Sequence, residues 1–150
     1  EPRKGQPISR DLIVDKSDFG DRLSKQYQRI RIEPIKTEDV NKFDKAAADI
    51  IYDMVNCTRC GCCDAGCPVL NEKPSEYAGP AMMLAIAYRH LDSYDQADRV
   101  LEAVSKGLYH CIMCGNCDKV CKRYEIEHVK AWQMLRDEAV KRGLKPSYAK

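Results

Sequence analysis

The chain has 150 residues, of which 44% are hydrophobic and 32% are charged, and its formal net charge is only +2. This length suits one compact domain with an additional arm, and so small a positive charge gives no reason to expect a nucleic-acid partner. The longest apolar stretch, Ala81 to Tyr88, is far too short to span a bilayer, so we expect no direct membrane insertion.

Residues 1–36 are rich in charged and polar side chains and predict an extended N-terminal arm. Two short apolar patterns interrupt them: the run Leu12-Ile13-Val14, and Ile30-Arg31-Ile32, whose alternation fits a short strand. Two interpretations of this arm stay open. It either drapes over the surface or docks on a partner subunit and becomes ordered there.

From Thr37 onward the pattern becomes helical. Thr37 is a candidate N-cap, and Glu38 and Asp39 place favourable negative charge in the first turn. Apolar residues then recur at helical spacing, namely Val40, Phe43, Ala47, Ile50, Ile51 and Met54. This pattern predicts a helix that leads the chain into Cys57.

Three further helices are predicted beyond this point. One begins at Gly79-Pro80 and continues to about Leu91, because proline at the first helical position loses no donor that the helix needs. The next is capped by Asp92 or Ser93 and stops at Gly107. The last extends from roughly Ile126 to Lys141, with Gly143 ending it and Trp132 on its buried side.

Nine cysteines dominate the middle of the chain, and eight of them form two runs with the spacing C-x2-C-x2-C-x3-C. The first run comprises Cys57, Cys60, Cys63 and Cys67, and the second comprises Cys111, Cys114, Cys117 and Cys121. This spacing is typical of bacterial iron–sulfur proteins with two clusters, in which the fourth cysteine of each run binds the other cluster. We therefore expect two [4Fe–4S] clusters as the cofactors.

The spacing also predicts which thiols share a cluster. Three cysteines at steps of three residues wrap one cubane, whereas the fourth lies beyond a further turn and faces the second cluster. The predicted ligands are Cys57, Cys60, Cys63 and Cys121 for cluster 1, and Cys111, Cys114, Cys117 and Cys67 for cluster 2. Gly61 and Gly115 are expected to let the backbone curl between the ligands.

A shift of 54 residues superposes the two runs and identifies the ninth cysteine as a spare. The shift places Cys57 on Cys111 and Asp64 on Asp118, but it places Cys62 on Asn116. We expect Cys62 to be a small buried residue beside a cluster, with a redox role or a disulfide as the other interpretation.

Two other uses of the cysteines fit the pattern poorly. Structural zinc sites use two C-x2-C pairs with a longer spacer between them. Two near-identical runs, one with adjacent Cys62 and Cys63, are also unlike a disulfide framework. The pattern favours a reducing, cytoplasmic setting. The two helices between the runs leave no room for a small ferredoxin with strands, which favours an all-α domain over residues 37–150.

The stretch from Ala78 through Arg89, followed by Asp92 and then by Gly107 to Cys111, resembles the helical ferredoxin domain of succinate dehydrogenase and fumarate reductase iron–sulfur subunits. It resembles the C-type iron–sulfur subunit of heterodisulfide reductase still more, because Cys114 completes the second run and no cysteine precedes Cys57. The resemblance covers about residues 45–143 and implies an alpha-helical ferredoxin domain with two cluster-binding loops. Lys122 departs from it, because the family usually has proline after the fourth cysteine.

This resemblance implies a subunit that transfers electrons and carries no catalytic residue of its own. The expected partners are a subunit that contains flavin and iron–sulfur clusters, and a cysteine-rich catalytic subunit, in a heterodisulfide-reductase-like complex of reductive or sulfur-oxidising type. Two alternatives are a freestanding ferredoxin and the iron–sulfur subunit of a membrane quinone or fumarate-type oxidoreductase. Three basic residues near the end of the second run, Lys119, Lys122 and Arg123, are a candidate docking patch for an acidic partner.

Overall fold

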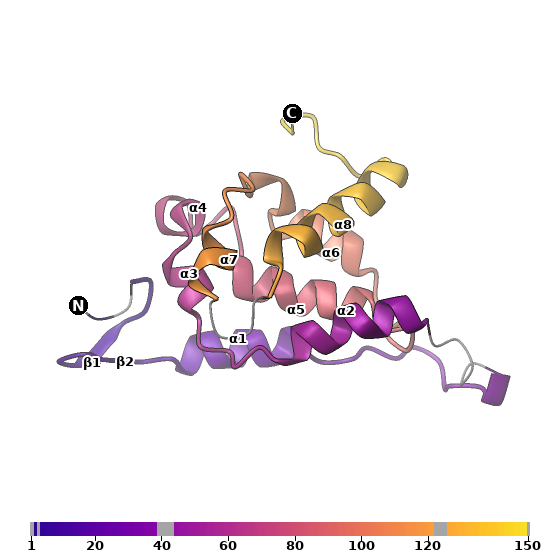
Figure 1. Cartoon of the computed structure of the whole chain (residues 1–150), viewed down its shortest axis with the longest axis horizontal. Helices are drawn as coiled ribbons and strands as arrows, with labels where there is room; N and C mark the ends of the chain where they lie inside the picture. The colour runs from indigo at the N-terminus through magenta and orange to yellow at the C-terminus, as the bar shows by residue number, and fades with distance from the viewer. Residues whose placement is uncertain (1, 3, 39–43, 122–125, 150) are drawn as a thin grey trace.

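The computed structural model describes residues 2, 4–38, 44–121 and 126–149, and most of its regular structure is helical (Figure 1). A two-stranded sheet precedes the helices, with β1 (Ile8–Arg10) antiparallel to β2 (Ile13–Val14). The helices are α1 (Ser17–Gln26), α2 (Lys45–Val55), α3 (Cys62–Ala65), α4 (Pro68–Glu72), α5 (Pro80–His90), α6 (Arg99–Ser105), the 3₁₀ helix η2 (Leu108–His110), α7 (Asn116–Val120) and α8 (His128–Lys141). The predicted helical architecture is therefore confirmed, with a hairpin added to it.

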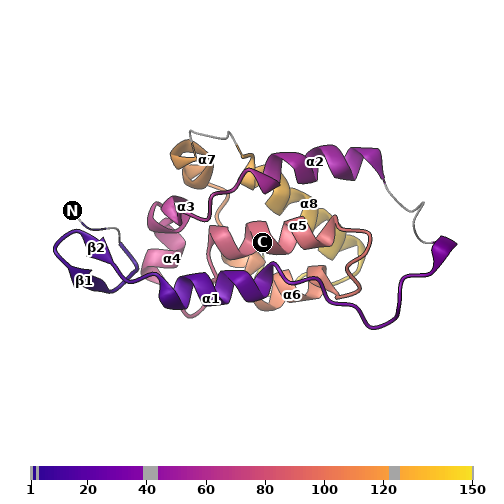
Figure 2. The same ribbon diagram turned by 90° about the horizontal axis from the view of Figure 1, so that it is seen from below.

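Helix α5 is the centre of the molecule, as Figure 2 shows. It begins as predicted, with Pro80 at the first helical position after Gly79, and it contacts α1, α2, α3, α6 and α8. Every residue from Pro80 to Ala87 is buried. A helix that is apolar on all sides needs neighbours on all sides, and these five helices provide them.

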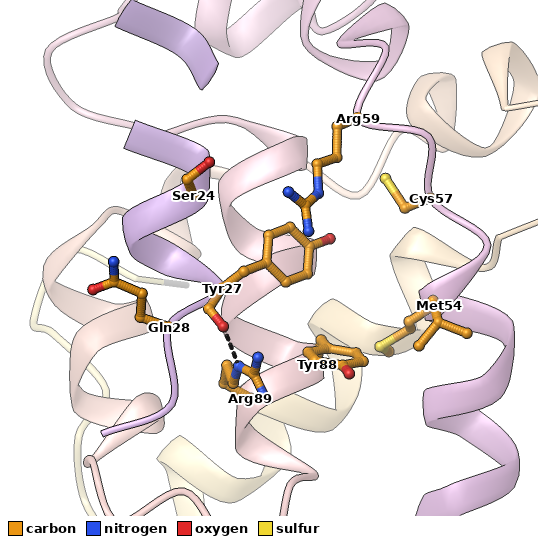
Figure 3. Close-up of a pocket in the computed structure, with 9 residues that line it drawn as sticks. Ser24, Tyr27, Gln28, Met54, Cys57, Arg59, Tyr88 and Arg89 are labelled. Atoms are coloured by element: carbon orange, nitrogen blue, oxygen red, sulfur yellow. Dashed lines mark hydrogen bonds between the residues drawn. The ribbon is translucent and has the colours of Figure 1, made fainter. Parts of the chain in front are cut away.

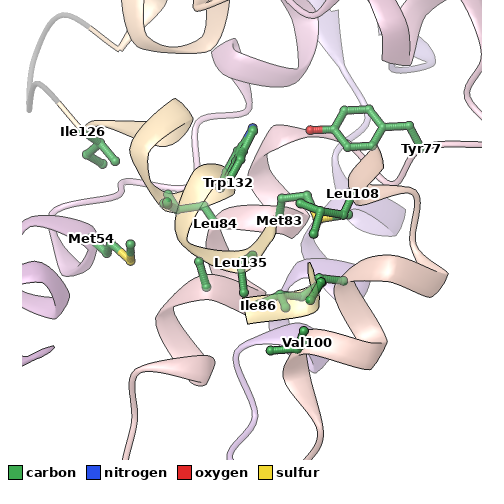
Figure 4. Close-up of a cluster of buried hydrophobic side chains, with 14 of the residues drawn as sticks. Met54, Tyr77, Met83, Leu84, Ile86, Val100, Leu108, Ile126, Trp132 and Leu135 are labelled. Carbon is green, nitrogen blue, oxygen red and sulfur yellow. The ribbon is translucent and has the colours of Figure 1, made fainter. Parts of the chain in front are cut away.

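Helix α8 closes the main apolar core, which Figure 4 shows. Trp132 and Leu135 of this helix are fully buried and pack in one cluster with Met83 and Leu84 of α5. Val100 of α6 and residues of η2 complete the same cluster. The prediction that Trp132 seals the domain is confirmed.

The N-terminal residues contain a helix that the sequence patterns did not indicate. Phe19 and Leu23 of α1 are buried in a second apolar cluster with Ala81, Met82 and Ala85 of α5. These two residues are four positions apart, which places them on one face of the helix. Because only this short face is apolar, a window longer than the helix hides the signal.

Residues 27–33 are held along the 89–102 segment by polar contacts. The Arg89 Nε atom donates to the carbonyl oxygen of Tyr27 at 2.5 Å, and Arg99 Nη2 donates to that of Gln28 at 2.7 Å. Arg99 also forms an ion pair with Asp95 whose side chains are 2% and 1% exposed. The arm is thus bound to the domain by both apolar and ionic contacts over this length.

The strand expected at residues 30–32 does not form. The side-chain oxygen of Gln96 accepts hydrogen bonds from the backbone N–H groups of Ile32 and Glu33, at 2.5 and 2.8 Å. The backbone N–H of Gln96 in turn donates to the carbonyl oxygen of Ile30 at 2.9 Å. A side chain therefore takes the donors that a neighbouring strand would have used.

Two helix starts differ from the prediction. The helix that leads into Cys57 begins at Lys45, where Asp44 accepts a hydrogen bond from the backbone N–H of Ala46 at 3.0 Å; Asp39, Val40 and Phe43 lie outside the described residues. Helix α6 is capped by Asp98, not by Asp92 or Ser93. Asp92 instead binds Arg29 and Arg89, so its carboxylate is already occupied.

The described helices include none with both the length and the apolar character that a bilayer span requires.

Replacing Leu23 with Ala should lower the free energy of unfolding by about 2–3 kcal/mol, because Leu23 is only 1% exposed and its removal leaves a cavity against α5. Chemical denaturation followed by circular dichroism measures the change. Replacing Leu12 with Ala in the same arm is the matched control, since that side chain is 70% exposed. Equal effects of the two substitutions would show that α1 contributes nothing to the core.

Candidate functional site

The two cysteine runs adopt the same backbone conformation. Gly61 and Gly115 have φ angles of +74° and +71°, in the left-handed region that glycine adopts most readily. The residues two positions earlier, Arg59 and Met113, both have φ angles of +54° although they are not glycine. The predicted role of the two glycines is confirmed as a demand on φ, because a Cβ atom on Gly115 would meet nothing within 4 Å.

Short helices bring the two runs together. Helix α3 follows Gly61 and helix α7 follows Gly115, and the two helices contact each other. They lie side by side in Figure 1. Each run therefore ends beside the other run, which is where the sequence places its fourth cysteine.

Four thiols from both runs line one cavity. They are Cys67 from the first run and Cys111, Cys114 and Cys117 from the second. Burial raises the pKa of the Cys117 thiol to about 12, and the nearby charges of Asp118 and Cys111 raise it as well. Burial also raises the pKa of Cys67, and Cys111 adds to the rise. These are the four residues that the spacing assigns to cluster 2.

The other four thiols influence one another in the same way. Burial raises the pKa of Cys121, and the nearby thiols of Cys57 and Cys60 raise it further. For Cys63, burial is again the largest cause of a raised pKa, followed by Asp64 and then by Cys57 and Cys60. The structure thus brings Cys121 near the first run, although 54 residues separate it from Cys67 in sequence.

The ninth cysteine differs from the expectation. Cys62 is exposed, so the interpretation as a small buried residue is wrong. It is the first residue of α3, whereas its neighbour Cys63 is buried. Successive residues of a helix point in different directions, so only one of two adjacent cysteines faces the interior. No disulfide links any of the nine cysteines, all of which lie in the described part of the chain.

The residues around the second set of thiols fit an iron–sulfur cluster. Tyr77 and Trp132 line the same cavity as the four thiols, and their polar atoms, Oη and Nε1, are buried without a hydrogen-bond partner among the described residues. Both groups are donors, and Figure 4 shows the Tyr77 hydroxyl directed toward the indole ring. Electron-rich sulfur atoms are acceptors for such donors. Ionised thiolates in one cavity repel each other, and iron is the cation that soft thiolate ligands select in this pattern.

Each cluster loop is tied to a core helix by the aspartate after its third cysteine. Asp64 Oδ1 accepts a hydrogen bond from the backbone N–H of Ala81 at 2.7 Å, at the start of α5. Asp118 Oδ1 accepts from the backbone N–H of His128 at 2.6 Å, at the start of α8. The two aspartates superpose in the sequence repeat, and this was the signal that could have predicted their shared role. Each carboxylate satisfies a donor that an open helix start leaves unpaired.

Replacing either Asp64 or Asp118 with Ala should lower the free energy of unfolding by about 1–2 kcal/mol, because each substitution removes a charged cap from a buried helix start. Urea titration of the full chain measures this change. Asp49 of α2 is exposed, and its replacement with Ala is the matched control, with an expected change within about 0.5 kcal/mol. The capping role is wrong if all three substitutions have the same effect.

The candidate docking patch is described only at Lys119, because Lys122 and Arg123 lie outside the described residues. Lys119 is exposed near the end of α7.

Comparisons with known proteins agree with the geometry of the thiols. Residues 53–124 match the family model of the 4Fe-4S dicluster domain. The chain is 34% identical over 145 residues to a subunit of the fumarate reductase (CoM/CoB) of Methanothermobacter marburgensis, an alignment that covers 93% of this chain and 28% of that protein. It is 33% identical over 129 residues to the fumarate reductase iron-sulfur subunit of Mycobacterium tuberculosis, which covers 82% of this chain and 51% of the relative.

An uncharacterized iron-sulfur protein of Methanococcus maripaludis is 30% identical over 148 residues, with 95% of this chain and 29% of that protein covered. The chain therefore contains a 4Fe-4S dicluster domain, and it is homologous to fumarate reductase iron-sulfur subunits and to archaeal iron-sulfur proteins. It spans between 28% and 51% of the length of these three relatives.

Proposed function

We propose that this chain is an electron-transfer subunit that holds two [4Fe–4S] clusters. Cys57, Cys60, Cys63 and Cys121 would bind cluster 1, and Cys111, Cys114, Cys117 and Cys67 would bind cluster 2. The observation that carries the proposal is the cavity lined by Cys67, Cys111, Cys114 and Cys117, because it combines thiols from both runs in the predicted set. When bound, such clusters accept and release single electrons.

The chain's own residues support this role through burial. The third cysteine of each run, Cys63 or Cys117, is buried, whereas the second cysteine, Cys60 or Cys114, is exposed. Each cluster would therefore have one side close to the surface, where the redox group of a partner could approach. The buried sides lie against α5 and α8, which hold the loops in place through Asp64 and Asp118.

We further propose that the partners are a flavin- and iron–sulfur-containing subunit on one side and a cysteine-rich catalytic subunit on the other, as in a heterodisulfide-reductase-like complex in the cytoplasm. The complete second run supports this assignment, since Cys114 lines the cavity with the other three thiols and suits a four-iron cluster. The order of transfer would then be from the flavin, through the two clusters, to the catalytic subunit, or the reverse.

A fumarate-reductase-type complex is the second candidate, and the homology to fumarate reductase iron-sulfur subunits favours it. In that case the chain would connect a flavoprotein to a different electron partner. The two candidates share the clusters and the flavoprotein, and they differ in the catalytic subunit.

Anaerobic purification of the chain from its native cells, with its partners attached, tests this proposal. The expected complex contains about eight irons per chain in this subunit, a flavoprotein and a cysteine-rich subunit. Recovery of a fumarate-reducing complex without a cysteine-rich subunit would support the second candidate. A monomer that never brings down a flavoprotein would contradict both and support a freestanding ferredoxin.

A further inference from the structure

The first thiol of the first run lies beside a tyrosine hydroxyl from the N-terminal arm. Tyr27 follows the last residue of α1, and it lines a cavity of about 260 Å³ together with Cys57, Arg59 and Tyr88. Figure 3 shows the Tyr27 hydroxyl directed toward Cys57, with the Arg59 side chain above the ring. The Arg59 guanidinium carbon is 4.5 Å from the ring centroid, which holds the ring in this position.

The first thiol of the second run has an equivalent neighbour. Tyr77 is 1% exposed and lines the cavity that contains Cys111. Its hydroxyl has no hydrogen-bond partner with acceptable geometry among the described residues. It nevertheless lies close enough to Cys111 to lower the pKa of that thiol, which is raised mainly by burial. The hydroxyl is thus a buried donor aimed at a ligand sulfur.

The two tyrosines do not belong to the sequence repeat, although the two cysteines do. Cys57 superposes on Cys111 with a shift of 54 residues, whereas Tyr27 and Tyr77 are 50 residues apart. Tyr27 comes from the end of α1, and Tyr77 comes from the loop between α4 and α5. Two separate parts of the chain therefore place the same chemical group beside the same ligand position.

We propose that Tyr27 and Tyr77 each donate a hydroxyl hydrogen bond to the first cysteine sulfur of a cluster, Cys57 and Cys111 respectively, and thereby raise the reduction potential of that cluster. This inference rests on the proposed function, since it assigns a role to residues next to the proposed ligands. It also makes α1 a part of the first metal centre, outside the residues that match the 4Fe-4S dicluster domain.

The direction of the effect follows from electrostatics. Reduction adds one negative charge to a cluster and its thiolates, and a hydrogen bond to a ligand sulfur stabilises the more negative form. Burial raises the pKa of both tyrosines, and the neighbouring cysteine charges add to that rise, so both hydroxyls remain protonated donors. Tyr27 and Tyr77 are therefore positioning residues, because they act through the ligand sulfur.

The test uses the full chain with clusters loaded, and it compares Y27F, Y77F and the double variant with the wild type. Reductive titrations followed by electron paramagnetic resonance give the potential of each cluster. Each single variant should shift one potential downward, the two variants should shift different clusters, and the double variant should shift both. Y88F and Y109F are the matched controls and should leave both potentials unchanged.

Both control residues lie close to the site without facing a ligand. Tyr88 lines the Tyr27 cavity and packs edge-on against that ring at 5.6 Å, but its hydroxyl points away from Cys57 in Figure 3. The Tyr109 hydroxyl is buried without a hydrogen-bond partner among the described residues, like that of Tyr77, but Tyr109 is not among the residues that line the cysteine cavity. They therefore separate donation to a ligand sulfur from a general effect of losing a hydroxyl.

A second measurement covers the case in which a phenylalanine variant loses its cluster. Wild-type chain produced with 3-fluorotyrosine carries more acidic hydroxyls, which donate more strongly, so both potentials should shift upward. Potentials that are unchanged in this protein, or in Y27F and Y77F with full iron content, would overturn the inference and leave the proposed function intact. A wild-type chain that binds no iron would overturn the proposed function, and this inference with it.

Discussion

Replacing Cys67 with Ser removes the cluster of the second run and leaves the cluster of the first run in place. The expected iron content falls from about eight to about four per chain, because iron–sulfur clusters require thiolate ligands and Cys67 belongs to the cavity of Cys111, Cys114 and Cys117. Serine keeps an acceptor at the start of α4, where the Cys67 sulfur now accepts from the backbone N–H of Leu70 at 3.5 Å. The substitution therefore tests ligation with little change to the helix.

Iron and sulfide analysis, combined with low-temperature spectra of the reduced protein, measures this outcome. Replacing Cys62 with Ser is the matched control, because that residue lies outside both predicted ligand sets and is exposed, and about eight irons should remain. If the Cys67 variant instead retained the second cluster and lost the first, each fourth cysteine would bind within its own run, contrary to the proposed ligand sets.

The second large effect is expected at Trp132, whose replacement with Ala should lower the free energy of unfolding by about 3–5 kcal/mol. The side chain is fully buried in the main core and also lines the cavity of the second set of thiols. A loss of this size is a large fraction of the roughly 5–15 kcal/mol that is usual for a domain. Because the same substitution opens the cavity to water, the second cluster should also lose iron faster in air.

Guanidinium denaturation under anaerobic conditions measures the stability of this variant, and the loss of iron absorbance in air measures the exposure of the cluster. Tyr52 is 70% exposed on α2, and its replacement with Ala is the control for removing an aromatic ring. That variant should lose iron at the wild-type rate and change in stability by no more than about 0.5 kcal/mol. A Trp132 variant as stable as the Tyr52 variant would show that the core does not depend on the indole.

The features that the sequence predicted best are those set by local rules. The positions of Gly79 and Pro80 correctly indicated where α5 begins, and Gly143 marked the end of α8 with a φ angle of +68°. The repeat of the cysteine runs predicted two loops of one shape, which the φ angles of Gly61 and Gly115 confirm. These signals depend on neighbours in sequence, so one chain is enough to reveal them.

The features that the sequence did not predict depend on contacts between distant segments. Helix α1 is held by Phe19 and Leu23 against α5, and the strand expected at residues 30–32 gives way to hydrogen bonds with Gln96. The position of Tyr27 beside Cys57 follows from this packing and has no counterpart in the repeat. No spacing rule reports such contacts, because both partners lie far apart along the chain.

Whether the arm also docks on a partner stays a prediction, as does the boundary between it and the domain. The side chains that remain accessible on its surface include Leu12 and Ile32, which are 70% and 78% exposed. An arm that docks through them would bury these residues in the complex.

The most direct test of the central claim is a map of anomalous scattering at the iron edge from crystals of the loaded chain. We expect two four-iron clusters, one held by Cys57, Cys60, Cys63 and Cys121 and the other by Cys111, Cys114, Cys117 and Cys67. Zinc in place of iron, or Cys67 and Cys121 bound to the cluster of their own runs, would contradict it.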